Sequence, residues 1–107
     1  MDKVYICSPY RGDIENNLLK ARKYCKYAID KGYVPIAPHI YFTQFMDDNN
    51  SIDREKAFEI NKELIKNCSQ LWICDNKISS GMQFEIDYAT AIGVPCVNKT
   101  IIFEEVN

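Results

Sequence analysis

Two serines and a glycine fall within one short polar segment in the last third of the chain, and these residue types can bind a small anionic ligand. The segment covers residues 75–85, with Ser79, Ser80 and Gly81 near its centre. Serine hydroxyls donate to phosphate oxygens, and glycine lets a ligand approach the backbone closely. Ser80, followed by Gln83, predicts a capping box that begins a helix and leaves Ser79 free for a ligand. The alternative is that the serines only cap this helix.

Glu85 lies in the second turn of the helix expected here. Met82 and Ala89 lie three residues before and four residues after it, so they share its face. A carboxylate on the apolar side of a helix is costly unless it is paired or used. This favours a catalytic role for Glu85, and the alternative is a helix rotation that leaves it at the solvent boundary.

A second candidate site is the loop at residues 8–13, which follows a predicted strand and precedes a predicted helix. Backbone N–H groups at a helix start, with an arginine beside them, form an anion site. The candidate ligand-binding residues of this loop are Ser8, Tyr10, Arg11 and Gly12. The alternative is a plain turn with a surface arginine. Neither a P-loop nor a dinucleotide-binding glycine pattern is present.

His39 and Tyr5 are associated with two predicted strands. His39 is the only histidine and follows the second strand, so it either lines a ligand site or fills a loop. It has no companions at metal-ligand spacing, and we expect no metal site. Tyr5 belongs to the predicted core, where its hydroxyl needs a hydrogen-bond partner.

Short apolar strands alternate with amphipathic helices along the chain. Strands are expected at 3–7, 34–37, 70–74 and 94–97, with an edge strand at 101–103; helices are expected at 14–31, 53–67 and 80–92, with a helical turn at 41–46. The helix at 53–67 should turn Ala57, Ile60 and Leu64 inward. The pattern predicts an α/β fold: a three-layer sandwich around a mostly parallel, Rossmann- or flavodoxin-like sheet of four to five strands.

In such a sheet, ligands bind at the carboxyl ends of the strands. The loops at 8–16, 38–52 and 75–81 should gather at this edge, which would bring the candidate residues together.

Composition limits the possible functions. The chain has 107 residues, which suits a single domain over 1–107, and its net charge of -2 argues against binding a nucleic acid polymer through a basic face. Its five cysteines include no CxxC pair and read as free, buried thiols of a reducing compartment. We expect a cytoplasmic protein with no signal peptide and no membrane span.

The sequence resembles the nucleoside 2-deoxyribosyltransferase-like superfamily from Lys3 to Val97, and most of all a family of short bacterial and phage proteins within it. Four short sequence motifs carry the resemblance, and they occur in the family's order and on the expected strands, loops and helices. They are SPYRG at 8–12, PH at 38–39, LW at 71–72 and SSGM…E at 79–85.

The resemblance implies roles for individual residues. In the transferases a glutamate on the last helix attacks C1′ of a deoxynucleoside, and a tyrosine of the first strand orients it; Glu85 and Tyr5 match these positions. In the related nucleotide N-glycosidases the 5′-phosphate is held by groups that match Arg11, Gly12 and Ser79. The transferases usually have an aspartate where Ser79 stands, so this serine points to a phosphorylated ligand.

The chain departs from these families in two respects. Both branches carry an aspartate on the preceding helix that handles base or sugar, and the nearest match here is Asn61, which cannot act as a general acid. Asp75 could take that catalytic part. The transferases also complete their site with a C-terminal stretch of a neighbouring subunit, whereas only ten residues follow Val97.

The resemblance implies cleavage of the N-glycosidic bond of a (deoxy)nucleoside 5′-monophosphate through a glutamate nucleophile, in a homo-oligomer that needs no cofactor. Two alternatives stay open. One is a nucleotide-binding module without catalysis. The other is an interaction protein of phage or mobile-element origin.

Overall fold

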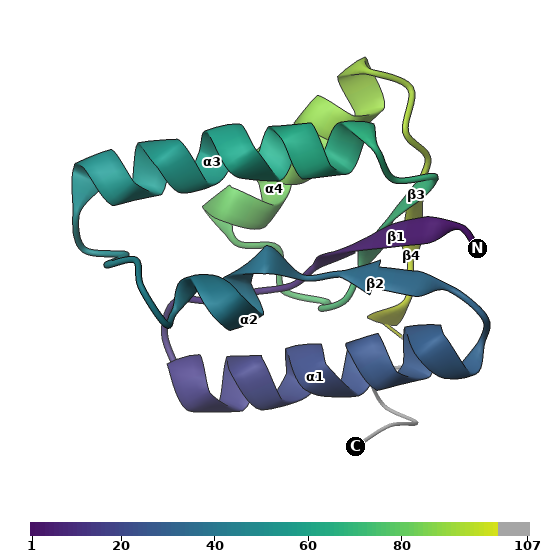
Figure 1. The fold of residues 1–107 in the computed structure, drawn as a ribbon, viewed down its shortest axis with the longest axis horizontal. Coiled ribbons are helices and arrows are strands. Elements are labelled where there is room, and N and C mark those ends of the chain that lie inside the picture. The colour runs from purple at the N-terminus through teal and green to yellow at the C-terminus, as the bar shows by residue number, and fades with distance from the viewer. Residues whose placement is uncertain (101–107) are drawn as a thin grey trace.

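The computed structural model describes residues 1–100 and shows a parallel sheet between two helical layers (Figure 1). The elements in chain order are β1 (Lys3–Cys7), α1 (Ile14–Asp30), β2 (Val34–Ile36), α2 (Pro38–Phe42), α3 (Ser51–Lys66), β3 (Gln70–Ile73), α4 (Ser80–Ala91) and β4 (Cys96–Asn98). The described strands have the order β2-β1-β3-β4, and all their pairings are parallel. The predicted α/β fold is confirmed.

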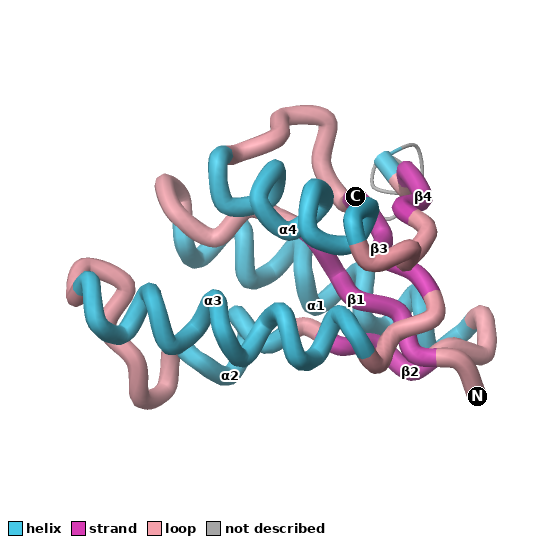
Figure 2. Tube along the Cα trace, turned by 90° about the horizontal axis from the view of Figure 1, so that it is seen from above, coloured by secondary structure: helices cyan, strands magenta, loops and turns pink. Residues whose placement is uncertain are grey.

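The alternation of side chains along β1 builds the two halves of the core. Tyr5 and Cys7 face the layer formed by α3 and α4, which lie side by side (Figures 1 and 2). Val4 and Ile6 face α1 on the other side, where they pack with Trp72. Because successive strand residues point to opposite faces, each apolar residue of this strand has a core to enter.

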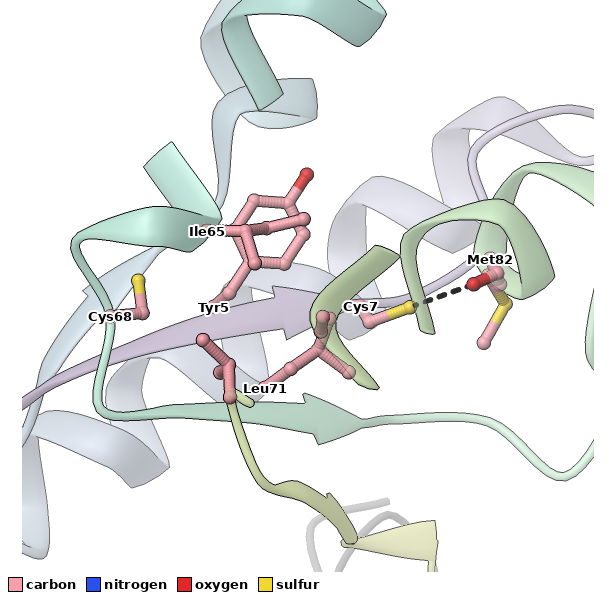
Figure 3. Packing of buried hydrophobic residues seen from close by; sticks show 8 residues of the cluster. Tyr5, Cys7, Ile65, Cys68, Leu71 and Met82 are labelled. Atoms are coloured by element: carbon pink, nitrogen blue, oxygen red, sulfur yellow. Dashed lines mark hydrogen bonds between the residues drawn. The ribbon is translucent and has the colours of Figure 1, made fainter. Parts of the chain in front are cut away.

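The first of these clusters lies beneath the candidate site. Tyr5, Cys7 and Met82 are almost fully buried there. Figure 3 shows the Cys7 thiol pointing toward the carbonyl of Met82, at 3.7 Å. This cluster ties the end of β1 to the start of α4, so that residues far apart in sequence have fixed positions relative to each other.

The chain order of the strands places a crevice between β1 and β3. From β1 the chain moves to β2 on one side and then to β3 on the other, and Cys7 is paired with Ile73 at the carboxyl ends. Loops that leave neighbouring strands in opposite directions leave a crevice between them. The loop after β1 and the loop before α4 border it. Gly12 in the first loop has a φ of +93°, a conformation that glycine adopts without strain.

Several sequence-based boundaries differ from the structure. The cap of α4 is Ser79, whose hydroxyl accepts from Met82 N at 3.2 Å, and not Ser80, which is the first helical residue. Two adjacent serines satisfy the same capping pattern, so the sequence could not choose between them. The helical turn expected at 41–46 is α2, which starts earlier because Pro38 occupies its first turn.

The inward face of α3 agrees with the prediction at Ala57, which lines the largely apolar space beside α4, and at Leu64, which packs against the core, but not at Ile60. Ile60 is exposed, whereas Ile65 is fully buried and Asn61 lies at the interface with α4. The strand predicted at 94–97 is β4, one or two residues further on. The edge strand expected at 101–103 lies outside the described residues. Within residues 1–100, no helix is long and apolar enough to cross a membrane.

Candidate active site

The carboxylate of Glu85 receives hydrogen bonds from three side chains of two other elements. The Tyr5 hydroxyl on β1 donates to Oε2 at 2.5 Å, and the Asn61 amide on α3 donates to the same oxygen at 3.2 Å. The Cys7 thiol lies 3.6 Å from Oε1. Three donors aimed at one carboxylate hold it in a single orientation, as a nucleophile requires.

Burial and hydrogen bonding act on Glu85 in opposite directions. Burial raises the pKa of this carboxyl to about 7, although the hydrogen bonds from Tyr5, Cys7 and Asn61 each lower it. The pKa of Tyr5 lies well above its usual value because of its own burial and the neighbouring carboxylate. Burial and Glu85 raise the pKa of the Cys7 thiol in the same way, so both groups stay protonated as donors.

Asn61 has one further feature. Its Nδ2 is committed to Glu85, and its Oδ1 is buried without a hydrogen-bond partner among the described residues. A buried acceptor without a partner is costly in a folded protein. Because this amide also lines the cavity described next, its oxygen is suited to accept from a ligand.

A cavity of about 450 Å³ opens at the carboxyl ends of β1 and β3, and Glu85 lies in its wall. It brings together ten of the predicted site residues: Tyr5, Ser8, Tyr10, Arg11, His39, Asn61, Ser79, Ser80, Gly81 and Glu85. Its volume lies in the range of small-molecule sites.

Two predicted site residues lie outside this set. Asp75 does not line the cavity; it begins the loop after β3, and its carboxylate accepts from Lys77 N at 2.9 Å in a local turn. The structure therefore does not place a second acid beside Glu85 at this position. Gly12 is likewise absent from the lining and contributes the turn that leads into α1.

The start of α4 can hold an anion. The first N–H groups of a helix have no acceptor within it, and here they belong to Ser80 and Gly81 at the cavity wall. The Ser79 hydroxyl uses its oxygen for the cap and still has a proton to donate. The prediction that Ser79 does not cap the helix was wrong. Its hydroxyl proton nevertheless remains able to donate to a ligand.

Arg11 is paired across the cavity mouth. Its Nε donates to Oδ2 of Asp48 at 2.5 Å, and its Nη2 donates to the carbonyl of Asp48 at 3.0 Å. Asp48 belongs to the loop between α2 and α3, inside the loop region predicted at 38–52, but it was not among the predicted site residues.

His39 forms a pair with Ser8. Its Nε2 lies 3.0 Å from the Ser8 hydroxyl, and burial lowers the pKa of the imidazole to about 4. The ring is therefore neutral at pH 7, and in the tautomer protonated at Nδ1 its Nε2 accepts a hydrogen bond from the Ser8 hydroxyl. Among the described residues, no group of three His, Cys, Asp or Glu side chains is placed to hold a metal ion.

The apolar part of the cavity wall was missed by sequence reasoning. It comes from α2, the loop after α2, α3 and α4, and it includes Phe42, Met46, Phe58 and Phe84. Phe58 and Phe84 also pack together, with ring centroids 5.0 Å apart. Aromatic residues of one helix do not reveal their partners on another, so only the fold could show this wall. Cys7 was also missed, although two-residue spacing from Tyr5 along a strand places both on one face.

Residues 2–99 match the profile of a domain family of unknown function, DUF7768, and the chain belongs to this family. No curated protein has a sequence significantly similar to it.

Solved structures similar to the chain share the nucleoside 2-deoxyribosyltransferase-like fold. A 2-deoxyribosyltransferase from Bacillus psychrosaccharolyticus has a TM-score of 0.72 and 21% identity, with 90% of this chain and 70% of that one covered. A 2-deoxyribosyltransferase from Leishmania mexicana has a TM-score of 0.65 and 20% identity, with 92% and 63% covered. The CMP N-glycosidase of Clostridium botulinum has a TM-score of 0.62 and 16% identity, with 98% and 82% covered. At these identities the similarity shows that the fold is shared.

Proposed function

We propose that this protein cleaves the N-glycosidic bond of a (deoxy)nucleoside 5′-monophosphate, with Glu85 as the nucleophile. The observation that carries the proposal is the carboxylate in the cavity wall, held by the Tyr5 hydroxyl at 2.5 Å and by the Asn61 amide. The fold shared with 2-deoxyribosyltransferases and with a CMP N-glycosidase supports it by analogy.

The ionised Glu85 attacks C1′, the C1′–N bond breaks, and the base leaves with the electron pair. The departing base takes its proton from water in the cavity, since the amide of Asn61 cannot supply one and Asp75 lies outside the lining; the water that later adds at C1′ returns a proton to the solvent. Water then adds at C1′, breaks the glycosyl ester and restores the carboxylate. A second base in place of water would give transfer instead of hydrolysis. This is the carboxylate chemistry of retaining glycosidases.

Binding groups on both sides of Glu85 support a nucleotide as substrate. The phosphate would lie between Arg11 and the start of α4, where Ser79 and two backbone N–H groups can donate. The aromatic residues of α2, α3 and α4 offer an apolar wall for the base. Binding energy at the phosphate would position C1′ for attack.

The test is to incubate the protein with the common ribo- and deoxyribonucleosides and their 5′-monophosphates and to follow free base by chromatography. Glu85→Ala should lower release by about a thousandfold or more. Asp87→Ala is the matched control: Asp87 is an exposed carboxylate of the same helix that bonds Gln83, and its loss should leave release unchanged. Release that survives Glu85→Ala would refute the role of Glu85.

A second candidate is a nucleotide-binding module without turnover, which Asn61 favours because an amide stands where an acid would assist the leaving base. It predicts that nucleotides raise the melting temperature while no base is released. Base release above the uncatalysed rate would exclude it.

We also propose that copies of this chain associate through the face formed by α3 and α4. Ile60 and Phe84 are 42% and 50% exposed there, and they line a second hollow with Phe58. Ile60→Asp should lower the mass measured by light scattering to that of one chain, 12.4 kDa. A wild-type protein that already has this mass would contradict the proposal.

Free thiols at all five cysteines support a cytoplasmic setting.

A further inference from the structure

The cation that would receive a ligand's phosphate is already engaged by a carboxylate of the protein itself. Arg11 uses two of its nitrogens on Asp48, one on the carboxylate and one on the backbone carbonyl. Both residues line the cavity that contains Glu85. A guanidinium has five N–H donors in a fixed fork, and Asp48 occupies the edge formed by Nε and Nη2, so a phosphate that binds this edge bidentately competes with Asp48.

The loop that carries Asp48 is a structured turn. Asp47 N donates to the Asp53 carboxylate on α3 at 2.8 Å, and Asn49 N donates to the Asp47 carboxylate at 2.9 Å. Asn50 then caps α3 by accepting from Ile52 N and from Asp53 N. The residues on both sides of Asp48 are therefore anchored, and its carboxylate is held toward Arg11.

The charged residues that line the cavity disfavour a phosphate, which makes its access to Arg11 important for binding. Four carboxylates line it against two guanidinium groups: Asp47, Asp48, Asp53 and Glu85 against Arg11 and Arg54. Tyr10 lies in the same region, and its pKa is raised by burial and then by Asp48 and Asp47. A phosphate that enters meets more carboxylates than guanidinium groups, and one of the guanidinium groups, that of Arg11, is already paired with Asp48.

We propose that Asp48 determines ligand specificity: it competes with a ligand's phosphate for Arg11 and so sets the preference of this cavity between phosphorylated and unphosphorylated nucleosides. The inference rests on the proposed function, because it takes nucleosides and nucleotides as the ligands. Nucleosides leave the Arg11–Asp48 pair intact, whereas nucleotides must displace the carboxylate.

The expected size of the effect follows from the exposure of the pair. The side chains of Arg11 and Asp48 are 57% and 33% exposed, and exposed pairs are worth about a factor of two to five in an equilibrium constant. Removing the carboxylate also removes its direct electrostatic repulsion of the ligand's phosphate. Asp48→Asn should therefore tighten nucleotide binding roughly five- to tenfold and leave nucleoside binding unchanged within about twofold.

The experiment measures dissociation constants by calorimetry for each common deoxynucleoside and its 5′-monophosphate, in a Glu85→Gln background so that no ligand is consumed. Asp48→Asn is compared with Asp30→Asn, which breaks an exposed ion pair of α1 with Lys26 that does not line the cavity. The control should change neither affinity.

A double-mutant cycle identifies the contact that is responsible. Arg11→Gln should weaken nucleotide binding, and in its presence Asp48→Asn should improve it by a smaller factor, because only the direct repulsion by Asp48 is then removed. Two results would overturn the proposal. One is an equal gain from Asp48→Asn with and without Arg11, and the other is no gain at all in the nucleotide-to-nucleoside affinity ratio.

The proposal and the proposed function fail in different ways. If no 5′-monophosphate binds with or without Asp48, the role of Asp48 is refuted. Base release from an unphosphorylated nucleoside that is lost in Glu85→Ala would then still establish the chemistry of Glu85. Conversely, a shift in preference without any base release would support Asp48 and refute catalysis.

Discussion

At Glu85 a partly buried carboxylate has to be ionised in order to act. Burial favours the protonated form and three donors favour the ionised form, with a pKa of about 7 as the balance. A nucleophile must be ionised, so base release should rise with pH along a limb near pH 7. Of the three donors, Tyr5 lowers the pKa of Glu85 most, and its hydroxyl also makes the shortest of the three contacts.

We predict that Tyr5→Phe moves this limb to higher pH by about one unit, because a hydrogen bond that lowers the pKa of Glu85 is lost. At pH 7 base release should fall by about ten- to a hundredfold, the worth of a hydrogen bond to a charged group. The measurement is the pH dependence of kcat/KM. Tyr33→Phe, on a ring packed against Trp72 on the α1 side, is the control. An unmoved limb would show that Tyr5 does not set the ionisation of Glu85.

At this scale the sequence predicted residue types better than contacts. Glu85 was singled out because it shares a helix face with Met82 and Ala89, and the need of Tyr5 for a partner was recognised. Spacing could not identify the partner, which lies eighty positions away, whereas the resemblance implied that it is Glu85. Asp48 was overlooked because nothing in a polar turn shows which cation it will contact.

At the scale of elements, the start of α4 is where prediction and structure differ most usefully. Ser79 was expected to be free, and its hydroxyl instead caps the helix by accepting from Met82 N. A cap of this kind stabilises a helix by about 1 kcal/mol. The same turn presents backbone N–H groups at the cavity wall, so the stability of this helix end and the proposed phosphate site depend on one residue.

Ser79→Ala should therefore lower the free energy of unfolding by about 1 kcal/mol, whereas Ser80→Ala should change it by a few tenths. Urea denaturation of the two variants measures this difference. Equal losses, or a larger loss for Ser80→Ala, would contradict the assignment of the cap.

Element types could be predicted because apolar periodicity differs between strands and helices. The orientation of α3 could not, because Ile60 and Ile65 both fit an amphipathic face and only contacts with α4 decide between them. The buried position of Ile65 and the contact of Asn61 with Glu85 are consequences of that choice.

At the scale of the whole molecule, two residues of the cavity give opposite pH dependences of stability. The pKa of Glu85 is raised from 4.5 to about 7, so its stabilising contribution is lost as pH rises through that window. The pKa of His39 is lowered from 6.5 to about 4, so its contribution is lost as pH falls through that window. Between pH 4.5 and 6.5 the two contributions oppose each other.

We predict that single substitutions reveal each contribution. Relative to the wild type, Glu85→Gln should gain about 1 to 3 kcal/mol of stability as pH rises from 4.5 to 7, because the buried charge is gone. His39→Gln should gain a similar amount as pH falls from 6.5 to 4. Denaturation over this pH range measures both. Parallel curves for the wild type and Glu85→Gln would contradict a raised pKa at Glu85.

The parallel sheet was predictable at this scale, but its strand order was not. Apolar strands separated by helices imply parallel pairing, yet several orders satisfy that pattern. The order β2-β1-β3-β4 places β1 beside β3, and so brings the Arg11 loop to the start of α4. The cavity lies where the loops that follow these two adjacent strands meet.

The most direct test of the central claim is to trap the covalent intermediate. A nucleoside 5′-monophosphate with fluorine at C2′ slows attack and release at C1′ by destabilising the oxocarbenium-like transition state. Intact-mass spectrometry after incubation should show the protein heavier by one fluorinated sugar phosphate, and peptide mapping should locate the adduct at Glu85. Base release without an adduct, or an adduct on another residue, would contradict the account.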